Sequence, residues 1–350
     1  MDVRLGPEQQ ALRDAAAQVV DKLGPQAVGQ LDDTERAAKL DAAVDASGWR
    51  ELRTAADTDS APLASAVEVG IVAEELGRGL ADTAFVGPTL AAELRRLSGA
   101  PPASATETIL VTSDLSAVVT AEATLPGDVV AVDAQGAASA LVLVTTPEGT
   151  ALGQVDVPPP GTGVDLTRPA VTLSPSWTVH PVADQAQALT SDDLTGVLAL
   201  GLAITCADLV GVMRGAVTLA TEYAKERRQY GQPVGAFQAV QHLLADAHVA
   251  TEGASSVTRH ACWAIDALAP DEALAAASVA KAYCARAART VCETAIQVHG
   301  GIGNTWECLA HVYLRRALVS SDLFGGVGAS LGRILDHHSI AWEGDPRGLR

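Results

Sequence analysis

The stretch Gln297-Val298-His299-Gly300-Gly301-Ile302-Gly303 ends a long apolar segment of helical periodicity with two consecutive glycines. Paired glycines can end a helix in a left-handed conformation and free backbone N–H groups for close approach to a ligand. Alone, this stretch would be explained by an ordinary glycine C-cap. It is followed, however, by Asn304-Thr305-Trp306-Glu307 and His311-Val312-Tyr313-Leu314-Arg315-Arg316-Ala317, and a second motif precedes it.

The second motif is Glu226-Arg227-Arg228-Gln229-Tyr230-Gly231, at the end of an earlier helical segment. Arg227 offers a rigid fork of donors that suits the paired oxygens of a pyrophosphate. A glycine and a proline then turn the chain into the next helix, which begins near Phe237-Gln238. The alternative is a charged helix terminus, in which Lys225 and the two arginines complement the helix dipole.

Together these stretches resemble the carboxy-terminal helical domain of the flavin-dependent acyl-CoA dehydrogenases. In that family an arginine, a glutamine and a QxxGG turn reach across a subunit interface to a neighbour's FAD. The resemblance therefore implies FAD as a cofactor shared across a subunit interface. It identifies the cofactor-binding residues as Arg227, Gln229, Tyr230, Gln238, Gln297, Val298, His299, Gly300 and Gly301.

Periodicity divides the chain into three parts and predicts an α+β fold. Residues 1–104 form a helical domain, residues 105–189 a small β-barrel or sandwich of short β-branched runs, and residues 190–350 a four-helix bundle. This order of domains is also that of the acyl-CoA dehydrogenases. The expected helices are 8–23, 33–47, 65–81, 194–229, 236–269, 271–299 and 307–321, and the expected strand runs are 109–112, 118–120, 129–132 and 140–144.

The resemblance also implies a catalytic carboxylate, which this chain lacks. The family removes the α-proton of an acyl-CoA thioester with a glutamate base, while the β-hydrogen leaves as hydride. In most members that glutamate stands at the position that corresponds to Phe324-Gly325 in this chain. In another branch it stands at the position that corresponds to Gly201. We therefore expect no catalytic residue in this chain and no activity from it alone. Asp208, about 10 Å beyond Gly201 along a helix, and Asp322 are the nearest substitutes.

The middle region departs from the family as well. Its E-P-x-x-G-S-D-like segment and W-I-T-N-like strand, which hold the flavin ring, have no counterpart here, since Ser113-Asp114-Leu115-Ser116 matches neither and Trp177 is the only tryptophan of the region. The half of the site that would hold this chain's own flavin is thus degraded, and the half that reaches a partner is intact.

This division resembles the actinobacterial heterotetrameric acyl-CoA dehydrogenases of steroid side-chain degradation, which pair a catalytic with a non-catalytic subunit. The resemblance implies that this chain is the non-catalytic subunit, with an acyl-CoA substrate in the partner's cleft and electron-transfer flavoprotein as electron acceptor. Two alternatives stay open. One is a self-sufficient homotetrameric dehydrogenase that uses Asp208, Asp322 or water as base, and the other is a structural subunit without flavin.

Composition narrows the class of protein. The formal net charge of −18 and the pI near 4.7 disfavour nucleic-acid or membrane-surface partners. The five cysteines form no C-x-x-C pair, which predicts free buried thiols and no metal site. Met1-Asp2-Val3-Arg4 does not begin a signal peptide, and the apolar window 197–213 contains Thr205 and Asp208, so we expect a cytoplasmic protein without a membrane span.

Overall fold

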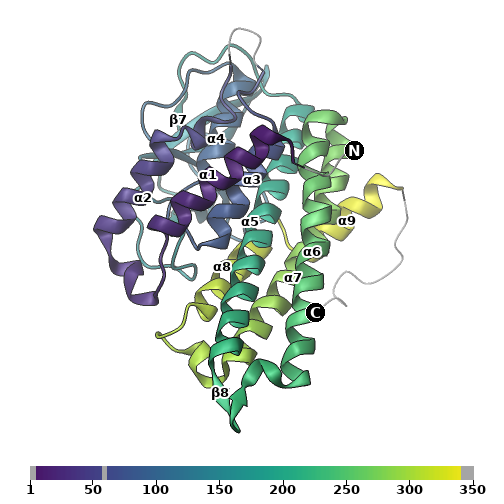
Figure 1. Cartoon of the computed structure of the whole chain (residues 1–350). Helices are drawn as coiled ribbons and strands as arrows, with labels where there is room; N and C mark the ends of the chain where they lie inside the picture. Colours follow the sequence, from purple (N-terminus) through teal and green to yellow (C-terminus); the bar gives the residue numbers. More distant parts are fainter. Residues whose placement is uncertain (1–4, 57–60, 340–350) are drawn as a thin grey trace.

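The computed structural model describes residues 5–56 and 61–339, in which helices, a β-sheet and a long helical bundle follow one another (Figure 1). The predicted α+β class and the order of its parts are confirmed. The domain boundaries at 104 and 189 stay a prediction. Residues 1–4, on which the signal-peptide argument rests, lie outside the described residues.

The first part consists of α1 (Pro7–Leu23), α2 (Thr34–Ala46), α3 (Ala66–Arg78) and α4 (Val86–Ser98), with short 3-10 turns η1 (Val28–Asp32) and η2 (Trp49–Glu51) between them. A capping box starts α3, because Glu68 accepts the Ser65 N–H at 2.9 Å. Helix α4, which periodicity had not separated, is capped from the sheet by Asp133, whose Oδ2 accepts the N–H groups of Phe85 at 2.7 Å and Val86 at 2.8 Å.

The middle part is a mixed sheet. Its strand order is β6-β3-β1-β4-β5-β7, with β2 also paired to β4, and the β1–β4 and β2–β4 pairs are parallel. Alternate residues of a strand face opposite sides, so Ile109 and Leu141 join the main core while Leu110 and Val142 build a separate small cluster. The strands are β1 (Glu107–Thr112), β2 (Thr120–Ala121), β3 (Val129–Ala131), β4 (Ser139–Thr146), β5 (Gly149–Asp156), β6 (Val171–Leu173) and β7 (His180–Pro181).

The last part is the bundle, in which α5 lies at the centre and packs against α3, α6, α7 and α8. Helix α5 starts at Thr190, whose Oγ1 accepts the Asp193 N–H at 3.1 Å. The elements of this last part are α5 (Ser191–Glu226), β8 (Arg228–Gln229), β9 (Gln232–Pro233), η3 (Val234–Ala236), α6 (Gln238–Ala267), α7 (Pro270–His299), η4 (Gly300–Asn304), α8 (Ala310–Asp322) and α9 (Val327–His337).

Four of the expected helix bounds were wrong by three residues. The helix expected over 65–81 ends at Arg78, and the helix expected over 194–229 begins already at Ser191. The helix expected over 194–229 ends at Glu226, because the residues that follow pair as the hairpin β8–β9. The helix expected over 307–321 begins only at Ala310, after η4 and a turn. Strands β5, β6 and β7 were not expected, since β6 and β7 are short and the buried positions of β5 are few.

Helix α5 is long and apolar enough to cross a membrane by length and composition, and it is the one such helix in the described residues. Most of its apolar window is buried inside the protein, as in the core helix of a bundle. Glycines let α3 approach it closely. A Cβ on Gly211 would lie 1.9 Å from Glu74 O, and one on Gly77 would lie 2.4 Å from Asp208 O. This contact joins the first helices firmly to the bundle.

Candidate functional site

The two motifs found in the sequence lie at the same end of the bundle. At the end of α5, the Arg227 N–H donates to Tyr223 O at 2.8 Å, and Arg227 O accepts from the Val234 N–H at 2.7 Å. The short hairpin β8–β9 projects from this end, at the lower tip of the molecule in Figure 1. Arg227 is thereby fixed at the base of the hairpin, with its side chain exposed.

The turn of this hairpin carries an exposed aromatic residue. Tyr230 has φ +52° and is 93% exposed, and Gly231 follows with φ +80°. Tyr230 and Gly231 are the two central residues of the β8–β9 turn, and the favoured two-residue hairpin turn requires a positive φ at both. The ring meets Phe237 edge to face, with centroids 6.3 Å apart. Tyr230 and Phe237 therefore form a small aromatic surface beside Gln238, the first residue of α6.

The glycine motif closes α7 beside the end of α5. The His299 ring stacks on the Tyr223 ring, with centroids 4.4 Å apart and an interplanar angle of 28°. Gly300 follows with φ +66° and ψ −143°, a conformation open mainly to glycine. A Cβ on Gly301 would meet nothing within 4 Å, so packing within the chain does not explain this second glycine.

The residues of this end differ in how free they are. Arg227, Gln229, Gln238, Gln297, Gly300 and Gly301 are exposed, Val298 is half-buried and His299 is buried. Within residues 5–56 and 61–339, the side chains of Arg227, Gln238 and Gln297 make no hydrogen bond or ion pair. An arginine fork, free amides and an open glycine backbone fit the pyrophosphate and polar groups of a dinucleotide. The assignment of each residue to a cofactor stays a prediction.

The two positions at which the resemblance predicts the family's base are in contact with each other. Phe324 is 1% exposed with φ +63°, and a Cβ on Gly201 would lie 2.9 Å from its Cε2 atom. The Phe324 N–H donates to Leu115 O at 2.7 Å, and its carbonyl accepts from Arg333 Nη2 at 2.9 Å. The aromatic ring therefore fills the space between α5 and the α8–α9 turn, where the resemblance predicts a carboxylate.

Asp208, one of the substitute bases, is fully engaged in a buried ion network. Its Oδ1 accepts from Arg316 Nε at 3.0 Å and Nη2 at 2.6 Å, and its Oδ2 accepts from Ser320 Oγ at 2.8 Å and lies 3.3 Å from Arg168 Nη2. Burial alone would raise the pKa of Asp208, but the two guanidinium charges and these hydrogen bonds hold it below its usual range. A carboxylate held in this way is a poor proton acceptor, so the Asp208 base interpretation is not supported.

Arg168 brings the loop before β6 into the helical interior, which the sequence did not indicate. It is 7% exposed and pairs with Asp165 Oδ2 at 3.1 Å as well as with Asp208. Thr167 Oγ1 accepts a hydrogen bond from Arg316 Nη1 at 3.0 Å. These side chains occupy the junction of sheet and bundle. In the sequence, the one signal of this feature is the stretch 165–168, Asp-Leu-Thr-Arg, whose short polar side chains favour a turn.

Asp322, the other substitute base, is exposed at the carboxy-terminal end of α8. No hydrogen bond or ion pair of its side chain with the described residues positions it toward Gly201 or Phe324.

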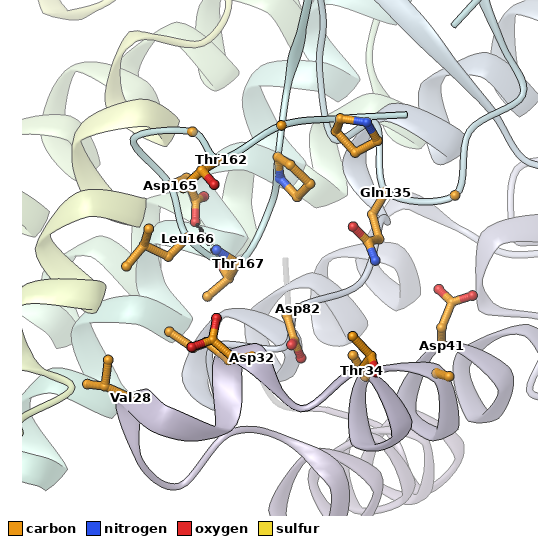
Figure 2. Close-up of a pocket in the computed structure, with 18 of the residues that line it drawn as sticks. Val28, Asp32, Thr34, Asp41, Asp82, Gln135, Thr162, Asp165, Leu166 and Thr167 are labelled. Atoms are coloured by element: carbon orange, nitrogen blue, oxygen red, sulfur yellow. Dashed lines mark hydrogen bonds between the residues drawn. The ribbon is translucent and has the colours of Figure 1, made fainter. Parts of the chain in front are cut away.

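A cavity of about 1030 Å³ lies elsewhere, between η1, α2, the loop before β6 and Trp306 (Figure 2). Among the described residues that line it there is no lysine or arginine, whereas Asp32, Asp41, Asp82 and Asp165 do line it. Asp41, Asp82 and Asp165 are each paired with an arginine that is not itself among these lining residues. Arg227 and the residues of the glycine motif are not among the described residues that line it.

The cysteines behave as expected. Cys206, Cys262, Cys284, Cys292 and Cys308 are all free and buried. Burial raises the pKa of Cys262 to about 12, so this thiol stays protonated at neutral pH. In the described part of the chain, no group of three or more potential ligands could hold a metal ion.

Comparison with known proteins gives the family. The model of the acyl-CoA dehydrogenase C-terminal domain matches residues 194–336. The chain is 31% identical to acyl-CoA dehydrogenase IpdE2 of Mycobacterium tuberculosis, over 96% of this chain and 98% of that protein. It is 29% identical to IpdE2 of Mycolicibacterium smegmatis, over 94% and 98% of the two chains.

Solved structures share the fold. A chain of the Tcur3481-Tcur3483 steroid ACAD superposes with a TM-score of 0.79 at 24% identity, over 96% of this chain and 99% of the other. A chain of the ChsE4-ChsE5 complex from Mycobacterium tuberculosis gives 0.75 at 23% identity, over 98% and 100%. At these identities the likeness concerns the fold alone.

Proposed function

The chain belongs to the acyl-CoA dehydrogenase family of oxidoreductases, and from that premise we propose that it is a non-catalytic subunit that completes its partner's FAD site. The complex would dehydrogenate an acyl-CoA thioester between its α and β carbons. This chain contributes cofactor contacts and no base.

The observation that carries this proposal is the contrast between the two halves of the chain. At the bundle end, Arg227 and Gln297 are exposed and have no partner among the described residues. At the base position, Phe324 is buried against Gly201, and Asp208 is bound by two arginines. The exposed polar groups at the bundle end can contact a partner's cofactor, whereas the space beside Gly201 has no room for a base. This combination favours a subunit that completes the site of a catalytic partner.

Each residue of the open end has a distinct task in this proposal. The Arg227 fork binds the pyrophosphate, Gln238 and Gln297 donate to polar groups of the adenosine half, and Gly300 and Gly301 let the backbone approach closely. Bound FAD supplies the hydride acceptor of the reaction. The base belongs to the partner, whose cleft also holds the acyl-CoA.

The partner is proposed to be a catalytic acyl-CoA dehydrogenase subunit, in a heterotetramer. The names of two structures with this fold are those of two-protein complexes, and one describes a steroid enzyme, which supports a bulky acyl group such as a steroid side-chain CoA ester. Electron-transfer flavoprotein as acceptor and a cytoplasmic location complete the proposal, by analogy with the family.

The two alternatives fit the site less well. A self-sufficient homotetramer needs a base, and Asp208 is engaged by Arg168, Arg316 and Ser320. A structural subunit without flavin leaves the free Arg227 fork and the open backbone at Gly301 without a purpose.

The proposal is tested by the flavin content of the co-expressed complex. The product of the neighbouring gene is the first partner to try, and flavin absorbance per heterodimer after gel filtration at low free FAD is the measurement. Arg227→Ala should weaken FAD binding roughly ten- to hundredfold, since hydrogen bonds to charged groups contribute about 1.5 to 3 kcal/mol. Arg228→Ala, the matched control in β8, should retain most of the flavin.

Equal and near-complete flavin retention in both variants would show that Arg227 is only a helix terminus. A second measurement addresses the missing base. The chain purified without a partner should not dehydrogenate acyl-CoA substrates with an artificial electron acceptor, and turnover by a homogeneous partner-free preparation would contradict the proposal.

A further inference from the structure

We propose that the stacked pair Tyr223 and His299 positions the two cofactor-binding motifs relative to each other and does not itself contact the ligand. The inference rests on the proposed function. It assigns His299, which the motif resemblance had placed among the cofactor contacts, to a positioning role.

An unbroken series of contacts joins the two motifs. Tyr223 O accepts the Arg227 N–H at 2.8 Å, so the backbone of Arg227 is held one helical turn from the Tyr223 ring. That ring stacks on His299, the last residue of α7. Gly303 packs closely on His299, since a Cβ added to Gly303 would lie 3.0 Å from the His299 Cβ. The ends of α5 and η4 are thus linked through the two rings.

The His299 ring is committed within the chain. Its Nδ1 lies 2.7 Å from Ala295 O, and because a carbonyl only accepts, Nδ1 is the protonated nitrogen. One ring face lies on Tyr223, and the residue is 7% exposed. A side chain so enclosed can hold the following glycines in place, whereas Arg227, Gln297 and Gly301 remain exposed.

Positioning matters here because the two motifs come from different helices. Arg227 is the C-cap of α5 and Gly300 is the C-cap of α7, and a ligand that touches both needs a fixed separation between them. A preorganised site binds more tightly because less order is lost on binding. Loss of an aromatic stack of this kind corresponds to roughly two- to tenfold in an equilibrium constant.

The test compares Tyr223→Leu with Tyr223→Phe, which keeps the stack, in the co-expressed complex. Tyr223→Leu should raise the dissociation constant of FAD roughly two- to tenfold, and Tyr223→Phe should match the parent. A readout without cofactor is amide hydrogen exchange over residues 297–304 in the flavin-stripped complex, which should be faster in Tyr223→Leu alone. Tyr283→Leu is the matched control, because Tyr283 is a partly exposed tyrosine that packs on Gly253 in another part of the bundle.

The outcomes separate the two proposals. If Arg227→Ala weakens FAD binding while Tyr223→Leu matches the parent in affinity and exchange, the positioning role is refuted and the proposed function stands. If Tyr223→Leu and Tyr283→Leu lower the affinity and the melting temperature equally, the pair is merely structural and the inference is also refuted. If Arg227→Ala and Tyr223→Leu both retain FAD fully, the proposed function fails, and the positioning role fails with it.

Discussion

Replacing Asp208 by asparagine should destabilise the protein strongly, because the carboxylate is the anion shared by two buried arginines. Asp208 is 1% exposed, and its two oxygens meet Arg316, Ser320 and Arg168 at 2.6 to 3.3 Å. Breaking a buried ion pair by removing one partner costs about 3–5 kcal/mol. We expect the lower value, since Arg168 keeps Asp165 and Arg316 keeps the carbonyl of Ala81.

The assay is urea unfolding at neutral pH, followed by far-UV circular dichroism, with the free energy of unfolding as the result. Asp322→Asn, an exposed aspartate, is the control and should stay within about 0.5 kcal/mol of the parent. If Asp208→Asn also stayed within about 0.5 kcal/mol, the network would not be the stabilising junction described here, and Asp208 would again be available as a base.

The same network makes a pH prediction. The pKa of Asp208 is lowered in the folded state, so its contribution to stability is complete above the unfolded value of about 3.9 and is lost as pH falls through the folded value. The free energy of unfolding should therefore drop below about pH 4. The drop should be smaller in Asp208→Asn, and identical acid profiles would contradict this assignment.

The remaining predictions concern the filled base position. Phe324→Ala should cost about 3–5 kcal/mol in urea unfolding, because it empties a fully buried site, and it should not create dehydrogenase activity; a change below about 1 kcal/mol would mean that the ring is not packed as described. Gly201→Ala should cost about 1–3 kcal/mol, because its Cβ would meet Phe324 Cε2 at 2.9 Å, and the smaller ring-free side chain of Phe324→Leu should relieve part of that cost in the double variant. Additive costs in the double variant would show that the two residues do not press on each other.

Much of the fold follows from the periodicity of the sequence, and the exceptions have physical reasons. The long helices of the bundle were predicted within a few residues because their apolar faces repeat over many turns. The end of α5 was missed because Arg228 and Gln229 have no side-chain pattern that distinguishes a last helical turn from a two-residue strand. Short strands such as β6 and β7 are set by pairing with distant partners.

The site was predictable only in part. Motif resemblance indicated Arg227 and the glycine turn, and the structure brings them to one end of the bundle. The filling of the space beside Gly201 was not predictable, because it depends on contacts between residues far apart in sequence. Phe324 meets Gly201, and Arg168 meets Asp208, through the packing of separate elements. The commitment of the His299 ring to Tyr223 depends in the same way on the neighbouring helix.

Helix α5 is one continuous helix that connects the space beside Gly201 with the end of the bundle where Arg227 lies. Gly201 lies in the helix and Arg227 is its C-cap, 26 residues further on, which at 1.5 Å per residue separates them by about 39 Å. Substitutions so far apart act independently on stability and binding. A protein built on such a helix can lose a catalytic group at one end while selection preserves the cofactor-binding residues at the other. The two ends can therefore evolve as separable traits, and the role of each family member has to be established for each end of this helix.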